Sequence, residues 1–195
     1  MPEGAPPVGH IGPNAILQVL PVLKQLGVEE VLDHANVRVP DGHSMVDQAE
    51  AARLHRQVRK DLPETADEIA ALAGRNTGDY ILKHRIPKLA QTLLKLSPPF
   101  LSAAILSRAI AANAWTFVGS GEFETLSPWQ FRILKNPLIA GEESPEPLCV
   151  WHAAVFERLY QKLVHKKCRC IEATCAAQPG QDACMFVIYY RSRPF

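Results

Sequence analysis

The sequence predicts an α+β fold in which a helical N-terminal half packs on an antiparallel β-sheet. Two observations predict this class. In residues 14–112, apolar side chains recur at the three- and four-residue spacings of helices, and prolines divide the pattern into segments. In residues 113–195, short β-branched and aromatic segments alternate with turns around one amphipathic helix. Helices followed by strands are typical of an α+β domain.

Length and charge limit the classes of protein that the chain can belong to. Its 195 residues predict one domain over residues 14–195, preceded by a proline-rich flexible arm at 1–13. The net charge of +1 argues against a nucleic-acid partner. The most apolar stretch, residues 98–118, contains Arg108, which argues against a transmembrane segment. Residues 1–7 show no secretory signal pattern, so we expect a cytoplasmic protein.

The helical part is expected to consist of short helices that prolines and glycines separate. The first runs from Asn14 to Gly27, with Pro21 kinking or dividing it. Acidic residues after Pro63 suit the start of a helix that runs toward Gly74. The remaining helices are expected at residues 28–34, 45–62, 79–85, 88–96 and 100–112.

The second part is expected to form four strands and one helix. Residues 114–118 are aromatic and β-branched and precede Gly119, which predicts a strand and a turn. The other strands are expected at 129–134, 168–176 and 184–191, the last two as a hairpin. Residues 148–165 have the pattern of an amphipathic helix.

All five cysteines lie between positions 149 and 184, which indicates a local site. Three thiolates and a carboxylate can form a closed tetrahedral zinc site. The candidate ligands are Cys149, Glu172, Cys175 and Cys184. In a regular strand, side chains three apart point to opposite faces, so this set requires the strand to end or bulge near residues 173–174.

Two alternatives to this ligand set remain open. Cys168 and Cys170 alternate onto the same strand face as Glu172 and would form the cluster if the strand stays regular. Alternatively, the cysteines are simply small buried apolar residues, which is a common role for cysteine. Spacing alone favours this second alternative, because the pattern matches no established zinc finger.

Three segments, residues 149–154, 172–175 and 182–186, resemble the vinyl-4-reductase domain family. Residues 12–16 and 77–82 extend the resemblance toward family members of bacteriochlorophyll synthesis. The resemblance implies a sandwich like those of transport-particle and ligand-sensor domains, with structural zinc on Cys149, Glu172, Cys175 and Cys184. It also implies a homodimer, an apolar ligand cavity and work on a chlorophyll precursor. Cys168 and Cys170 depart from the family pattern.

The family name implies reduction of a vinyl group, which requires an electron donor. The glycine pair of residues 119–121 is not a dinucleotide fingerprint, and we detect no NAD or flavin motif. A carrier that binds a chlorophyllide-type tetrapyrrole and passes it to pigment-synthesis enzymes is therefore the preferred interpretation. The alternatives are a divinyl chlorophyllide or protochlorophyllide 8-vinyl reductase and a small-molecule-sensing dimerisation module.

A tetrapyrrole needs aromatic walls, an axial ligand for its metal and cations for its carboxylate. The expected walls are Trp115, Phe117, Trp129 and Trp151, with His152 as the axial ligand. Arg85 or Lys88 is the expected cation. Apolar residues of the helical half, such as Leu93, Leu96, Phe100, Leu101 and Ile105, are expected to close the slot. Each of these residues also has an ordinary explanation in the core or at the surface.

Overall fold

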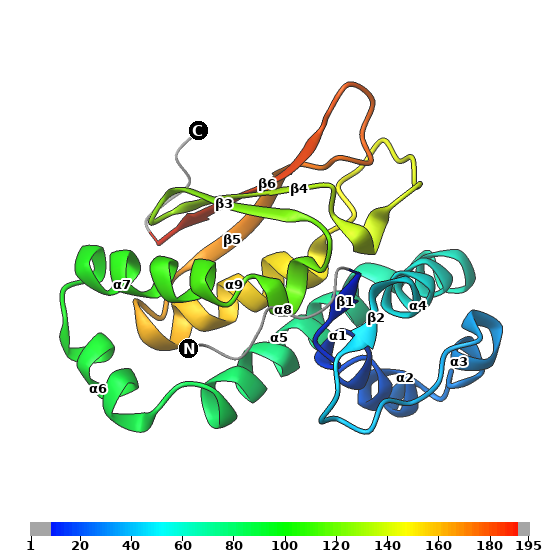
Figure 1. The fold of residues 1–195 in the computed structure, drawn as a ribbon, viewed down its shortest axis with the longest axis horizontal. Helices are drawn as coiled ribbons and strands as arrows, with labels where there is room; N and C mark the ends of the chain where they lie inside the picture. Colours follow the sequence, from blue (N-terminus) through cyan, green and yellow to red (C-terminus); the bar gives the residue numbers. More distant parts are fainter. Residues whose placement is uncertain (1–8, 191–195) are drawn as a thin grey trace.

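The fold, a computed structural model that describes residues 9–190, has a four-stranded antiparallel sheet over a helical layer (Figure 1). The predicted arm therefore lies outside the described residues up to position 8, and so does the predicted last strand residue, Arg191. Within the arm, His10–Ile11 forms a short strand, β1, and Ile11 is fully buried. The arm prediction is thus wrong for these residues, because Ile11 belongs to the core.

The helical half contains seven helices up to residue 112 in the described chain. Gly27 takes a left-handed conformation and ends α2, as predicted, and the chain divides just before Pro21. The elements are α1 (Asn14–Leu17), α2 (Leu20–Leu26), α3 (Glu30–Ala35), β2 (Val46–Asp47), α4 (Gln48–Asp61), α5 (Ala66–His84), α6 (Lys88–Leu96) and α7 (Pro99–Ala112).

The sheet half holds the strands in the order β3-β4-β6-β5, all antiparallel. Helix α9 runs beneath the sheet, and α5 lies beneath α9 (Figure 1). The elements are α8 (Trp115–Val118), β3 (Glu122–Ser127), β4 (Gln130–Leu134), the 3-10 turn η1 (Pro137–Ile139), α9 (Val150–Leu163), β5 (Arg169–Thr174) and β6 (Ala183–Tyr189).

The core lies between α9 and the sheet. Strand residues of alternating position, such as Phe131 on β4 and Phe186 on β6, are fully buried, and their rings pack on Phe156 of α9. On its other side α9 packs closely on α5, where a Cβ added to Gly74 would lie 2.5 Å from the Trp151 carbonyl oxygen. Glycine at this position lets the two helix backbones approach each other.

Three predicted elements are corrected by the structure. Residues 114–118 form one helical turn, α8, and not a strand, because the turn lets Phe117 pack on Phe156 and buries Val118. The segments 63–74 and 79–85 are parts of one continuous helix, α5, because Gly74 is held by its packing against α9.

Strand β3 was not predicted, because it lacks apolar alternation. It is an edge strand, and its acidic residues pair with cations on and just after β4, Glu124 with Arg132 and Glu122 with Lys135. Such cross-strand pairs stabilise a sheet without an apolar face. The predicted fold class, a helical half on an antiparallel sheet, is confirmed.

Candidate metal centre

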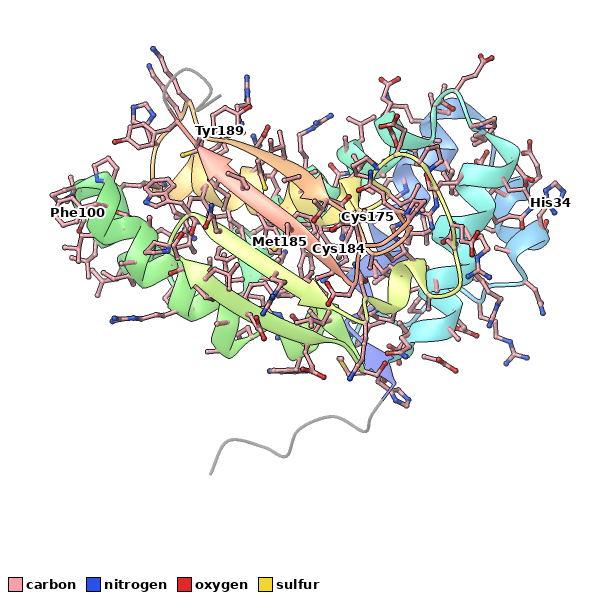
Figure 2. All side chains as sticks on the ribbon, turned by 90° about the horizontal axis from the view of Figure 1, so that it is seen from above. His34, Phe100, Cys175, Cys184, Met185 and Tyr189 are labelled. Atoms are coloured by element: carbon pink, nitrogen blue, oxygen red, sulfur yellow. The ribbon has the colours of Figure 1, made fainter. Side chains whose placement is uncertain are left out.

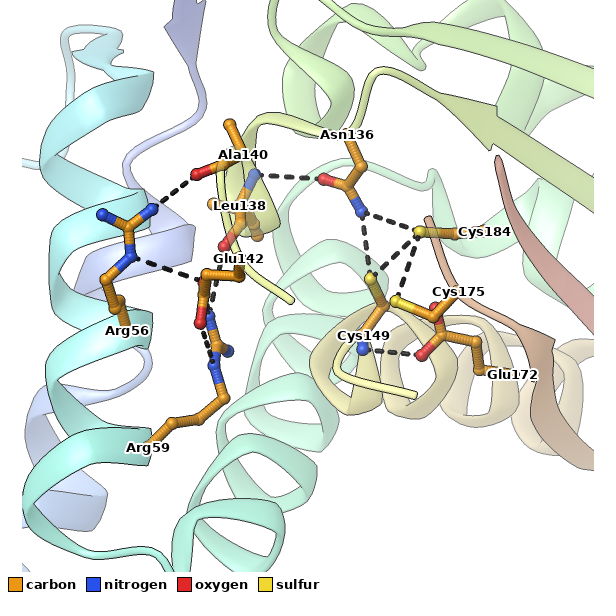
Figure 3. A network of polar contacts seen from close by, with 10 residues as sticks. All are labelled: Arg56, Arg59, Asn136, Leu138, Ala140, Glu142, Cys149, Glu172, Cys175 and Cys184. Atoms are coloured by element: carbon orange, nitrogen blue, oxygen red, sulfur yellow. Dashed lines mark hydrogen bonds and ion pairs between the residues drawn. The ribbon is translucent and has the colours of Figure 1, made fainter. Parts of the chain in front are cut away.

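Four side chains from three elements converge beside the start of α9 (Figure 3). Cys149 is the residue that precedes α9, Glu172 lies on β5, Cys175 directly follows β5, and Cys184 lies on β6. One ligand atom from each, three sulfurs and a carboxylate oxygen, all lie within 4.8 Å of one another. These are the four residues that the sequence proposed together.

The strand irregularity that this ligand set requires is present. The pairing of β5 with β6 shifts register between Glu172 and Thr174, which marks a β-bulge, and β5 ends at Thr174. The bulge breaks the alternation of side chains, so that Glu172 and Cys175 face the same site. The rival residues Cys168 and Cys170 lie outside this group, before or near the start of β5.

The cluster is buried and crowded. The sulfurs of Cys149 and Cys184 lie 3.3 Å apart, and those of Cys175 and Cys184 lie 3.9 Å apart. The backbone N–H of Cys149 donates to Glu172 Oε2 at 2.6 Å. The other carboxylate oxygen, Oε1, is buried and has no hydrogen-bond partner among the described residues. An acceptor left in this way costs about 1–3 kcal/mol unless a cation or donor reaches it.

Burial also makes it costly to ionise these groups together. It raises the pKa of Glu172 to about 8 and raises the pKa of the Cys149 thiol well above its ordinary value. The pKa of Cys175 is lowered, because the Cys149 and Cys184 thiols donate hydrogen bonds to its thiolate. A divalent cation would remove the conflict, because it stabilises several thiolates and a carboxylate at once.

Asn136 is a member of the site that sequence reasoning missed. Its side-chain amide donates to the sulfur of Cys149 at 3.2 Å and faces the sulfur of Cys184 at 3.8 Å. Its Oδ1 accepts from the N–H of Leu138 in η1. In the sequence, Asn136 followed by Pro137 only signals the end of a strand, and nothing there points to sulfur contact.

Helix α4 holds the loop that carries Asn136. Arg59 donates to Glu142, with which it forms an ion pair, and to the carbonyl of Leu138 at 3.3 Å (Figure 3). Arg56 donates to the carbonyl of Ala140. The cluster is thus supported from the helical half as well as from the sheet.

The predicted ligand walls do not surround one open cavity. Trp151 and His152 are buried, and His152 Nε2 lies 3.3 Å from the Phe117 carbonyl oxygen. Burial lowers the pKa of His152 to about 4. Trp129 stacks on Tyr190 at another part of the core, and Trp115 is 44% exposed. Of the five residues, the structure brings together Phe117, Trp151 and His152, packed on one another or on neighbouring rings.

An open groove lies instead between α5 and α6. It has a volume of about 440 Å³ and is lined by Asp79, Leu82, Lys83, Lys88, Gln91, Thr92 and Lys95. Three of these residues are lysines, and one of them, Lys88, is a cation that the sequence proposed for a carboxylate. A much smaller cavity of about 10 Å³ lies beside His55 and Arg59.

The vinyl-4-reductase domain matches residues 129–189, which include all four residues of the cluster. The bacteriochlorophyll synthase 23 kDa chain of Cereibacter sphaeroides is 45% identical over 97% of this chain and 96% of that protein. The chain belongs to this family. The Rhodobacter capsulatus protein of the same name is 43% identical over 94% of this chain and 89% of that protein. Membership of the family supports a role in bacteriochlorophyll biosynthesis.

Solved H-NOX structures share the fold at low sequence identity. An H-NOX protein from S. oneidensis has a TM-score of 0.55 at 14% identity and covers 93% of this chain and 100% of its own. One from K. algicida has a TM-score of 0.57 at 10% identity, covering 94% and 98%. A third, described as probing heme distortion in the H-NOX family, has a TM-score of 0.53 at 11% identity, covering 95% and 97%.

Proposed function

We propose that this chain is a zinc-stabilised carrier that binds a chlorophyllide-type tetrapyrrole in bacteriochlorophyll biosynthesis. The similarity to two bacteriochlorophyll synthase 23 kDa chains over nearly the whole length carries this proposal. The fold adds support, because one neighbour is described by the distortion of its heme, which is also a tetrapyrrole. In this role the chain holds the pigment, while pigment-synthesis enzymes supply and consume it.

Zinc is the metal that best fits the four-residue cluster. Three thiolates and one carboxylate form a complete tetrahedral set, and the orphaned Oε1 of Glu172 supplies a further acceptor for a cation. A set of four protein ligands leaves no open position, so we assign zinc a structural role. It would tie the start of α9 to β6 and to the end of β5, as Cys149, Cys184 and Cys175 place it.

For the pigment, we favour the groove between α5 and α6. Its lysines can bind a propionate carboxylate, and a volume of about 440 Å³ falls within the range of small-molecule sites. The aromatic set of Trp115, Phe117, Trp129, Trp151 and His152 stays a prediction. A pigment would reach His152 only if its ring separated from those of Phe117 and Trp151.

Titration of the purified protein with chlorophyllide tests the carrier function. We expect a shift in pigment absorbance and quenching of tryptophan fluorescence at micromolar pigment. A Lys88→Gln/Lys95→Gln variant should bind roughly tenfold or more weakly, because each charged hydrogen bond is worth about 1.5–3 kcal/mol. The matched control, Lys24→Gln/Lys60→Gln, removes two exposed lysines outside the groove and should bind as the wild type does.

The same preparation separates the carrier from its alternatives. Conversion of divinyl chlorophyllide to the reduced product with a nicotinamide or reduced ferredoxin donor would indicate an 8-vinyl reductase. Absence of any spectral change at micromolar pigment would overturn the carrier proposal and leave a small-molecule-sensing dimerisation module. We also propose a homodimer, which light scattering of the protein without pigment tests.

A further inference from the structure

The segment from Tyr80 to Gly121 contains no aspartate or glutamate, although the chain as a whole is nearly neutral. Its five cations are all exposed, and none of them takes part in an ion pair within residues 9–190. They are Lys83, Arg85, Lys88, Lys95 and Arg108. This part of the surface is therefore positive, whereas acidic residues elsewhere, such as Asp79 beside Arg158, pair with cations.

The same segment exposes large apolar side chains on α6 and α7, which we call the α6–α7 hairpin (residues 88–112). Leu89, Leu93 and Leu96 recur at spacings of four and three residues, so they form one stripe along α6. Their exposed fractions are 72%, 59% and 80%. On α7, Leu101 and Ile105 are 43% and 46% exposed, in a stripe with Arg108.

The hairpin forms one end of the molecule, with Phe100 at its tip (Figures 1 and 2). Phe100 is 71% exposed. Only one inner side of α6 contacts the rest of the fold, through Leu94, which is 7% exposed. Among the described residues, no helix is both long and apolar enough to cross a bilayer. Any contact of this end with lipid would therefore be at the membrane surface.

We propose that the α6–α7 hairpin docks on the surface of an anionic lipid bilayer, with its leucines and Phe100 in the interface and its cations at the headgroups. Leucine stripes flanked by lysine and arginine are the composition of interfacial helices. Protein interfaces, in contrast, are depleted in lysine. A second copy docked on the same face would bring five unpaired cations against five others, which disfavours it.

Co-sedimentation with vesicles tests the proposal without pigment. Vesicles of phosphatidylcholine with added phosphatidylglycerol should bind the wild-type protein, and vesicles of phosphatidylcholine alone should bind it much less. High salt should weaken binding to the anionic vesicles, because it screens the cations from the headgroups. Because the groove lysines are not changed and no pigment is present, failure here is distinct from failure of the carrier proposal.

Two double variants separate the apolar from the charged contribution. Leu93→Gln/Leu96→Gln should lower vesicle affinity at least about tenfold, since it removes two inserted side chains. Arg85→Gln/Arg108→Gln should lower it about fivefold for each charge, and these arginines do not line the groove. The control Leu26→Gln changes a leucine that is 48% exposed on α2 and should bind as the wild type does.

Circular dichroism checks that each variant is folded, which the exposure of the replaced side chains favours. Equal binding of wild type and both double variants would overturn the proposal, and so would absence of binding to anionic vesicles. Loss of a wild-type dimer in Leu93→Gln/Leu96→Gln, measured by light scattering without lipid, would also overturn it and assign the face to a second copy. Binding to an acidic protein surface in place of anionic vesicles would have the same consequence.

Discussion

The cysteine cluster and the α6–α7 hairpin depart from ordinary burial in opposite ways. In the cluster, a carboxylate oxygen and three sulfurs are enclosed together, and Glu172 Oε1 has no partner in the described chain. In the hairpin, Leu89, Leu93 and Leu96 face solvent beside unpaired cations. Folded proteins rarely leave either condition uncompensated. The comparison indicates that each region is completed by something outside the chain, a cation in one case and a lipid surface in the other.

The largest expected effect is loss of the metal from the cluster. Cys184→Ser should lower the free energy of unfolding by about 3 kcal/mol or more, because structural zinc binding is coupled to folding. Urea denaturation measures it. Cys170→Ser is the control, since Cys170 is a half-buried β5 cysteine outside the cluster, and it should keep most of the stability. Equal losses in both variants would mean that Cys184 acts only as a buried side chain.

The hairpin offers a pair of neighbouring leucines with opposite environments. Leu94→Ala should lower the free energy of unfolding by about 2–3 kcal/mol, because it leaves a cavity in the inner face of α6. Leu93→Ala should change it by less than about 0.5 kcal/mol, because Leu93 is already in solvent. Thermal or urea unfolding of the two variants compares them. A large loss for Leu93→Ala would mean that the outer stripe is already packed in the free protein.

The packing of α5 on α9 joins the two regions, because α5 leads to the hairpin and α9 starts at the cluster. Gly74→Ala should destabilise the protein by about 1–3 kcal/mol, since the new Cβ would lie 2.5 Å from the Trp151 carbonyl oxygen. Alanine normally stabilises a helix relative to glycine, so the sign is informative. Gly78→Ala meets Arg158 side-chain atoms instead and should cost less. An increase in melting temperature for Gly74→Ala would contradict this packing.

The smallest effect concerns two histidines that are buried without charge compensation. Burial lowers the pKa of His55 to about 3 and that of His152 to about 4. Below about pH 6.5 the unfolded chain binds protons that the folded chain does not, so stability falls as the pH falls from 6.5 toward 4. The limit is about 1.4 kcal/mol per pH unit for each histidine.

His55→Gln tests this pH dependence, because glutamine does not titrate and can still donate to the Ala15 carbonyl that His55 Nε2 contacts at 2.9 Å. Urea denaturation at about pH 7 and about pH 5 should show a smaller loss for the variant than for the wild type. An unchanged loss would mean that His55 does not contribute to the acid sensitivity.

Much of the fold and of the cluster can be predicted from the sequence, because local patterns determine them. Apolar spacing located most of the helices, and segregation of the cysteines pointed to the cluster. What could not be predicted depends on tertiary contacts. Residues 114–118 have strand propensity, but Phe117 packs on Phe156 as part of a helical turn. Asn136 reaches the sulfurs only because α4 holds its loop.

The predicted pigment walls show the same limit. Sequence reasoning grouped Trp129 and Trp115 with Trp151 because all are aromatic, whereas the fold stacks Trp129 on Tyr190 and leaves Trp115 half exposed. It also expected Leu93, Leu96 and Phe100 to close a pigment slot, but they face solvent. An apolar helix pattern identifies a stripe, but it does not specify what covers that stripe.

Zinc-edge X-ray absorption, combined with elemental analysis of the purified wild-type protein, tests the central claim most directly. We expect about one zinc ion per chain, coordinated by three sulfur atoms and one oxygen, and no bound zinc in Cys184→Ser. A zinc-free wild-type protein, or zinc retained in Cys184→Ser with unchanged sulfur coordination, would contradict the assignment of Cys149, Glu172, Cys175 and Cys184 as its ligands.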